Sequence, residues 1–266
     1  LVDHKTYVIA SDGDLMEGIS QEAISLAGHL KLSKLIVLFD DNNISIDGSI
    51  DLSDSTDQLM RFEASGWDVN RVDGHNHKDI ELAIESAINS NKPSLIACKT
   101  RIGFGSPSKE GKSSSHGAPL GEEDIVQMKK NLNWDCKEFE TPTDVKDAWR
   151  LIGLRNSSKR QEWEARVTES KDKGIELLND INGDISDELD KAINEIKKTF
   201  SEEKPNWATR KSSQEVLETI NEVLTNTIGG SADLTGSNNT KTNNIEVISS
   251  DNFKGRFIHY GIREHG

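Results

Sequence analysis

The sequence predicts an α/β fold: a parallel sheet with helices on both faces, followed by the start of a second α/β domain. Four apolar, strand-like runs alternate with helix-like segments in the first hundred residues. Such alternation is typical of parallel strands joined by right-handed crossovers. A second helix-and-strand pattern begins after Pro205, beyond a charged stretch.

The strands of the first domain are expected where short apolar runs occur, namely at Thr6–Ala10, Leu35–Phe39, Trp67–Val72 and Ser94–Lys99. Between the first two runs, apolar residues recur at spacings of three and four, which predicts one helix along Leu15, Ile19, Ala23, Leu26 and Leu30. A shorter pattern predicts a helix over Glu81–Ser90. The segments therefore form successive strand–helix–strand units.

Residues 101–120 interrupt this rhythm with a stretch rich in Gly, Ser, Pro and Lys. A loop of this length in a compact domain is usually functional or disordered. Residues 122–204 are highly charged and helical in pattern, with Trp134, Trp149 and Trp163 as expected packing anchors. The pattern also predicts an amphipathic helix over Asp187–Phe200.

The domain boundary is expected where charge and proline follow that helix, at Glu202–Pro205. The predicted domains are residues 1–204 and 205–266. In the second domain we expect a helix over Ser213–Leu224 and a strand over Phe257–Tyr260. The chain begins at Leu1 and ends inside a strand–turn pattern, so we expect a piece of a longer protein.

The acidic composition of the chain argues against some classes of binding partner. The 266 residues carry a formal net charge of −14, which disfavours a nucleic-acid partner or an anionic membrane partner. The simplest interpretation of this acidity is a solvated surface. Cys98 and Cys136 form no CxxC spacing, and Cys98 lies in an apolar run typical of a buried strand. A reducing, cytoplasmic location is expected.

Two polar clusters each follow a predicted strand directly, at Ser11–Asp14 and at Asp41–Ile44. Ligands of open parallel sheets gather at the carboxyl ends of the strands. Asp12 offers a carboxylate and Asn42 an amide oxygen, and a backbone carbonyl near Ile44 completes a set that suits Mg²⁺ or Ca²⁺.

Gly13 would let its backbone approach a phosphate group closely. The alternative is that the two clusters are ordinary turns, since Asp, Asn and Gly dominate turns in any case. The residues alone leave both interpretations open.

Six segments, in order along the chain, resemble the transketolase family: Asp12–Gly18, Asp40–Gly48, Lys99–Gly121 (its two ends), Arg210–Ser213, Gly229–Leu234 and Tyr260–Glu264. The family's usual Gly-Asp-Gly opening is Ser11-Asp12-Gly13 here, and we expect the small serine to preserve the turn. The resemblance implies a thiamine-diphosphate-binding fold. It also implies thiamine diphosphate and Mg²⁺ (or Ca²⁺) as cofactors.

The resemblance also implies roles at the cofactor. The metal would be bound by Asp12, Asn42 and the carbonyl of Ile44. The diphosphate would contact Gly13 and Asn42. The other residues near the cofactor would be His116, Asp233 and, at a subunit interface, Glu17.

For substrate and catalysis, the resemblance implies that Arg210, Ser237 and His116 bind the sugar phosphate. Glu264 would be the catalytic acid that acts on the aminopyrimidine ring, and His116 would share in catalysis. Without the resemblance, His116 would be interpreted as an exposed loop histidine. Glu264 would likewise be interpreted as a solvated carboxylate at a strand end.

The implied reaction is transfer of a two-carbon ketol unit from a ketose phosphate to an aldose phosphate through a thiamine-diphosphate carbanion, in the pentose phosphate pathway. The implied assembly is a homodimer with its active site at the subunit interface. We expect the isolated chain to have little or no activity. The alternatives are dihydroxyacetone synthase, deoxyxylulose-phosphate synthase, or a non-catalytic transketolase-like subunit.

Overall fold

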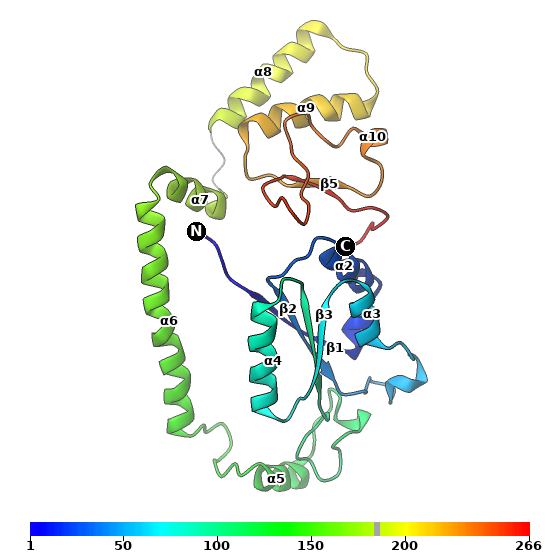
Figure 1. The fold of residues 1–266 in the computed structure, drawn as a ribbon, viewed down its shortest axis with the longest axis vertical. Coiled ribbons are helices and arrows are strands. Elements are labelled where there is room, and N and C mark those ends of the chain that lie inside the picture. Colours follow the sequence, from blue (N-terminus) through cyan, green and yellow to red (C-terminus); the bar gives the residue numbers. More distant parts are fainter. Residues whose placement is uncertain (184–186) are drawn as a thin grey trace. The chain divides into compact units, whose positions relative to one another are not determined.

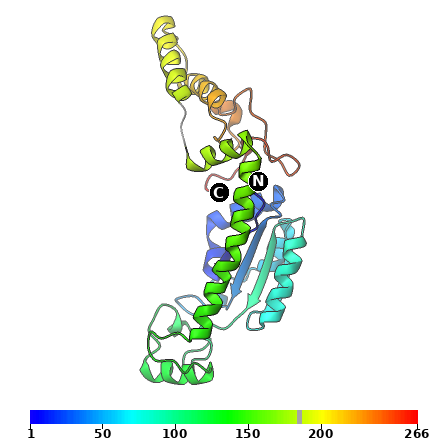
Figure 2. The same cartoon turned by 90° about the vertical axis from the view of Figure 1, so that its left-hand side faces the viewer.

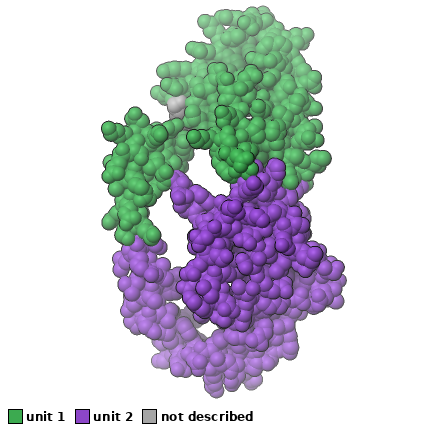
Figure 3. All heavy atoms as spheres, viewed as in Figure 1, with its two compact units in different colours: residues 1, 158–266 green, residues 2–157 purple. Residues whose placement is uncertain are grey.

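The computed structural model describes residues 1–183 and 187–266, and their contacts divide into two compact units. The first unit contains residues 2–157, and the second contains Leu1 with residues 158–266 (Figure 3). This division follows packing, and the domain boundary after residue 204 stays a prediction.

A four-stranded sheet forms the centre of the first unit, with the strand order β1-β2-β4-β3 and every pair parallel. The strands are β1 (Thr6–Ser11), β2 (Leu35–Asp41), β3 (Asp68–Asp73) and β4 (Ser94–Lys99). All four predicted strands are confirmed, with boundaries within two residues. Because β1 and β2 are neighbours, Ser11 lies opposite Asp40, and the polar clusters that follow them share one edge.

Helices cover both faces of this sheet, as predicted (Figures 1 and 2). The α1 (Asp12–Met16), α2 (Gly18–His29) and α3 (Gln58–Ala64) helices pack on one face, and α4 (His77–Asn89) packs on the other. Alternate strand residues supply the two cores. Val37 and Phe39 lie in the first core with Phe62 and Trp67, and Ile36 and Ile96 lie in the second with Ala83 and Ala87.

The single helix predicted between the first two strands is wrong, because the structure has two helices separated at Glu17. Glu17 is extended, with φ −59° and ψ 140°. Two residues earlier, the carbonyl oxygen of Leu15 accepts hydrogen bonds from Gln21 Nε2 at 2.7 Å and Arg61 Nη2 at 3.0 Å. These side chains take the place of the backbone N–H groups that would continue the helix.

A close approach at Gly28 holds α2 against the turn that follows α3. A Cβ atom added at Gly28 would lie 1.8 Å from the carbonyl oxygen of Ser65. We expect Gly28→Ala to lower the free energy of unfolding by about 1–3 kcal/mol, the usual cost of overpacking. Chemical denaturation measures the change. Gly153→Ala on the exposed helix α6 (Thr143–Glu169) is the matched control, since no atom lies within 4 Å there; equal destabilisation by both changes would contradict the prediction.

The loop over residues 101–121 is held by hydrogen bonds from the helix that follows it, α5 (Glu122–Asn131). Asp124 accepts a hydrogen bond from the Ser106 hydroxyl and another from the Ser108 backbone N–H at 3.2 Å. The hydroxyl of Ser106 lowers the pKa of Asp124 below its usual value. Asn131 Nδ2 donates to the Gly105 carbonyl at 2.8 Å. These contacts show an ordered loop, and its expected function stays a prediction.

The second unit begins within α6 and continues through α7 (Asp172–Asn182), α8 (Asp187–Glu203), α9 (Thr209–Val223), β5 (Gly229–Ser231), α10 (Thr235–Asn238) and β6 (Phe257–His259). The strands β5 and β6 form a parallel pair. The helix predicted from Asp187 is confirmed, and the next helix begins four residues earlier than predicted. Trp149 is 72% exposed, so its expected role as a packing anchor is wrong for the described chain.

Cys98 is buried in β4, as the sequence predicts, and burial raises the pKa of its thiol. Cys136 is also a free thiol. Across residues 1–183 and 187–266, no helix has the length and apolar character that crossing a membrane requires.

Candidate active site

The ends of β1 and β2 bring the two predicted polar clusters into contact. Asp12 directly follows β1 and begins α1, and Asn42 directly follows β2. The backbone N–H of Asn43 donates to Asp12 Oδ2 at 3.1 Å, across 31 positions of sequence. The predicted meeting of the two clusters at one edge of the sheet is therefore confirmed.

Asp12 is a buried carboxylate with 8% of its surface exposed. Burial raises the pKa of Asp12, the nearby charge of Asp41 raises it further, and the Asn43 N–H partly offsets both effects. The neighbouring cations Lys99 and Arg71 pair with Asp41, at 3.1 and 3.7 Å. Within the described part of the chain Asp12 has no ion-pair partner, so a bound cation would supply the charge that this site lacks.

The side chain of Asn42 lies between two hydrogen-bonding groups of the β2 end. Its Nδ2 donates to Asp40 Oδ2 at 3.1 Å, and its Oδ1 accepts from the Ile44 N–H at 2.9 Å. The amide oxygen is thus turned toward the segment around Ile44, where the third ligand was predicted.

The backbone pairing around Ile44 indicates which way its carbonyl group faces. Ile44 and Ser49 form an isolated antiparallel bridge whose hydrogen bonds are made by neighbouring residues, Asn43 with Ile50 and Ser45 with Gly48. In such a non-hydrogen-bonded pair, the N–H and C=O groups of each residue both face away from the paired strand. The Ile44 N–H donates to Asn42, so we infer that the Ile44 carbonyl oxygen faces the same side as Asn42.

The turn at Ser11–Gly13 leaves room for a ligand. A Cβ atom added at Gly13 would meet no atom within 4 Å, so this backbone faces open space. Ser11 is extended at φ −112°, which needs no glycine, and its N–H and hydroxyl donate to Asp14 at 2.7 and 2.8 Å. The conformation of Ser11 is thus compatible with a serine at this position.

A hollow of about 280 Å³ opens beside Asp12 and is lined by Asp41, Asn43 and Arg71, but not by Asn42 or Ile44. One carboxylate, one amide oxygen and one carbonyl oxygen form a hard-oxygen donor set that fits Mg²⁺ or Ca²⁺. Groups of three or more His, Cys, Asp or Glu side chains that could bind a metal are absent from the described residues.

The other predicted residues of the first unit are exposed. Glu17 lies at the break between α1 and α2, and His116 follows a short turn at Ser113–Ser115. No hydrogen bond in the described chain joins His116 to Asp12 or Asn42. The predicted roles of Glu17 and His116 remain predictions.

The second unit contains the other four predicted site residues, and two of them lie beyond the ends of β5 and β6. Asp233 lies two residues beyond β5 and is left-handed at φ 60°, and Glu264 lies five residues beyond β6. Since β5 and β6 are parallel neighbours, these two residues leave the same edge of the pair. Arg210 lies in the first turn of α9 and Ser237 in α10. All four are exposed, so the described residues do not supply the shielding from water that was expected for Glu264.

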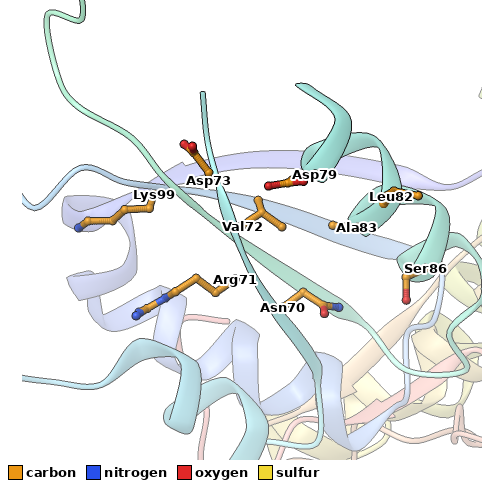
Figure 4. Close-up of a pocket in the computed structure, with 9 residues that line it drawn as sticks. All are labelled: Asn70, Arg71, Val72, Asp73, Asp79, Leu82, Ala83, Ser86 and Lys99. Carbon is orange, nitrogen blue, oxygen red and sulfur yellow. The ribbon is translucent and has the colours of Figure 1, made fainter. Parts of the chain in front are cut away.

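A larger hollow of about 680 Å³ lies over β3 and α4 and contains none of the predicted site residues. In Figure 4, Arg71 and Lys99 extend away from the α4 residues Asp79, Leu82 and Ser86. Their charged groups reach Asp41, as the ion pairs show. Arg71 and Lys99 therefore balance the charge of Asp41 at the end of β2.

Sequence reasoning missed two residues beside Asn42, namely Asp40 as its partner and Thr100 at the end of β4. The Thr100 hydroxyl donates to Asp40 Oδ1, and its N–H donates to the Asp41 carbonyl at 3.2 Å. The sequence does show two acidic residues, Asp40 and Asp41, at the end of β2, but this pattern does not identify Thr100 as their partner.

Comparison with known proteins decides the family. Residues 1–190 match the family model described as "Transketolase, thiamine diphosphate binding domain", and residues 206–266 match "Transketolase, pyrimidine binding domain". The chain belongs to the transketolase family. The polar clusters at the ends of β1 and β2 thus lie within the family's thiamine diphosphate binding domain.

Among transketolase relatives, the transketolase of Rhodobacter capsulatus is 50% identical over the whole chain, which corresponds to 40% of that protein. A Leishmania mexicana transketolase structure matches 99% of the chain at 37% identity and a TM-score of 0.89, over 40% of its own length. A Pichia stipitis transketolase in complex with sedoheptulose-7-phosphate matches equally well, at a TM-score of 0.89. The chain spans about 40% of the length of these relatives.

Proposed function

We propose that the protein containing this chain is a transketolase that transfers a two-carbon ketol unit from a ketose phosphate to an aldose phosphate. One observation carries the proposal: a buried carboxylate, Asp12, contacts the Asn42–Asn43 segment at adjacent strand ends. This contact lies inside the matched thiamine diphosphate binding domain. The two-strand site therefore has both the ligand chemistry and the family context of a cofactor site.

In this proposal Mg²⁺ is held by Asp12, the Asn42 amide oxygen and the Ile44 carbonyl, and the diphosphate lies against Gly13 and Asn42. Mg²⁺ usually binds through a few protein oxygens together with phosphate oxygens, which agrees with a small protein donor set. Thiamine diphosphate, when bound, supplies the nucleophilic carbon and the electron sink of the reaction. The protein supplies binding and orientation.

The residues of the second unit are proposed to act on the opposite end of the cofactor and on the substrate. Glu264 holds a proton at the aminopyrimidine ring, and Asp233 lies beside it. Arg210 and Ser237 bind the sugar phosphate, with Arg210 as a charge-assisted donor. His116 orients the substrate from the loop of the first unit.

A homodimer with the active site at the subunit interface is part of this proposal, with Glu17 at that interface. The substrates are proposed to be sugar phosphates, since a relative from Pichia stipitis forms a complex with sedoheptulose-7-phosphate. The location in the cell is proposed to be cytoplasmic, which agrees with two free cysteines.

The test is an assay of the full natural chain with Mg²⁺ and thiamine diphosphate, comparing two-carbon transfer between sugar phosphates with condensation of pyruvate and an aldehyde. We expect transfer between sugar phosphates, and little or no activity from residues 1–266 alone. Pyruvate condensation without transfer would favour a deoxyxylulose-phosphate synthase, and efficient use of formaldehyde as acceptor would favour a dihydroxyacetone synthase. Binding of the cofactor without any turnover would favour a non-catalytic subunit.

A further inference from the structure

Asp40 connects two side chains at the carboxyl edge of the sheet. One of its oxygens, Oδ1, accepts a hydrogen bond from the Thr100 hydroxyl, and the other, Oδ2, accepts from Asn42 Nδ2 at 3.1 Å. Its carboxylate therefore lies between the end of β4 and the residue that follows β2. None of the roles implied by the family resemblance includes Asp40 or Thr100.

The two contacts of Asn42 determine which way its amide faces. The oxygen and nitrogen of an amide are nearly equal in size, so hydrogen bonding and not shape selects the orientation. Asp40 Oδ2 accepts the hydrogen bond from Asn42, so it takes the NH₂ group. The backbone N–H of Ile44 can only donate, so it takes Oδ1, at 2.9 Å. Both partners favour the same orientation of Asn42.

Thr100 fixes the position of Asp40 from the neighbouring strand. It follows Lys99, which is the last residue of β4 and lies opposite Asp41 in the register of β2 and β4. The Thr100 N–H donates to the Asp41 carbonyl at 3.2 Å, and its hydroxyl reaches Asp40. A β-branched side chain has few χ1 rotamers, so the hydroxyl is held in place.

We propose that Asp40 and Thr100 are positioning residues that turn the amide oxygen of Asn42, and not its nitrogen, toward the metal. This inference rests on the proposed function and deepens it, because it assigns the geometry of one metal ligand to two residues outside the ligand set. An amide nitrogen carries hydrogens and cannot bind a cation, so an Asn42 free to flip is a weaker ligand. Outer partners of this kind typically change metal affinity by about 10–100-fold.

The test is calorimetric titration of Mg²⁺ into the full natural chain in the presence of thiamine diphosphate. We expect Asp40→Asn to weaken Mg²⁺ binding by about 10–100-fold, because a neutral amide can donate as well as accept and no longer selects one orientation. The control Asp68→Asn makes the same charge change at the opposite, amino end of the sheet, where Asp68 starts β3. It should bind Mg²⁺ as the wild type does.

Thr100 allows a second comparison that separates positioning from folding. Thr100→Val removes the hydroxyl with little change of shape and should weaken Mg²⁺ binding, whereas Thr100→Ser retains the hydroxyl and should restore it. The thermal unfolding midpoint of the metal-free protein is measured for each variant. We expect Mg²⁺ affinity to change while this midpoint stays close to that of the wild type.

Unchanged Mg²⁺ affinity in Asp40→Asn or in Thr100→Val would overturn the inference. It would also be overturned if both variants lost metal-free stability in step with affinity, since the residues would then be structural. Asp12→Ala, measured in parallel, tests the proposed metal site itself. Loss of binding in Asp12→Ala with normal binding in Asp40→Asn would refute this inference alone, whereas normal binding in Asp12→Ala would refute the proposed site.

Discussion

Glu264→Gln should lower kcat by about 10²–10⁴-fold, the usual contribution of a positioned acid or base. The proposed task of Glu264 is to hold a proton at the aminopyrimidine ring, and a glutamine of the same shape forms a hydrogen bond there without exchanging the proton. Glu264 follows β6, on the edge of the pair from which Asp233 also leaves. The change should therefore remove catalysis and leave the opposite, metal-binding end of the site intact.

Steady-state kinetics of the full natural chain measure this effect, together with titrations of thiamine diphosphate and Mg²⁺. The affinity for Mg²⁺ should match that of the wild type. Glu222→Gln is the control, because it makes the same substitution at an exposed position on α9 of the same unit. If the two variants had the same kcat, Glu264 would not be the catalytic acid.

Asp12→Ala should weaken Mg²⁺ binding by more than about 100-fold, since even partners outside the ligand set cost about 10–100-fold. Asp12 is the only carboxylate of the proposed ligand set, and it is buried at 8% exposure. Turnover should be lost with the metal, because the diphosphate would then lie near acidic residues such as Asp41 without a cation between them. Isothermal titration with thiamine diphosphate present measures the binding.

Asp14→Ala is a demanding control for this prediction. Asp14 lies two residues away and accepts hydrogen bonds from Ser11, but it belongs to no proposed ligand set. Its loss should cost about 0.5–2 kcal/mol of stability, as for other helix caps, and leave Mg²⁺ affinity unchanged. Equal loss of Mg²⁺ binding in both variants would show that the effect comes from disturbing α1.

The strands could be predicted because their buried residues form continuous apolar runs in the sequence. Val37 and Phe39 face one core and Ile36 faces the other, so β2 is apolar on both sides. Its last two residues, Asp40 and Asp41, were missed, because they are polar although they still pair with β4. Apolar patterning locates the buried part of a strand and not its functional end.

The break at Glu17 could not be predicted from periodicity. The apolar spacing continues through it, yet the carbonyl of Leu15 is taken by Arg61, a residue 46 positions later. A contact of this range depends on the packing of α3, which local pattern does not specify. The same reason applies to Thr100, which is 60 positions from its partner Asp40.

The meeting of Asp12 and Asn42 could be predicted because both residues directly follow strands that are neighbours in the sheet, and their role as metal ligands remains a prediction. Asp12 and Asn42 needed only the strand ends and the rule that ligands gather there. The roles of Glu264, Arg210 and Ser237 came from family resemblance alone, because nothing in their local pattern distinguishes them from surface residues. They remain predictions for the kinetic experiments.

The position of a bound cation is the most direct test of the proposed metal site. Crystals of the full natural chain with thiamine diphosphate and Ca²⁺ would show the ion by its anomalous scattering. We expect the ion about 2.3–2.6 Å from a carboxylate oxygen of Asp12, the amide oxygen of Asn42 and the carbonyl oxygen of Ile44. An ion bound elsewhere on the first unit, or one that Asp12 does not touch, would contradict it.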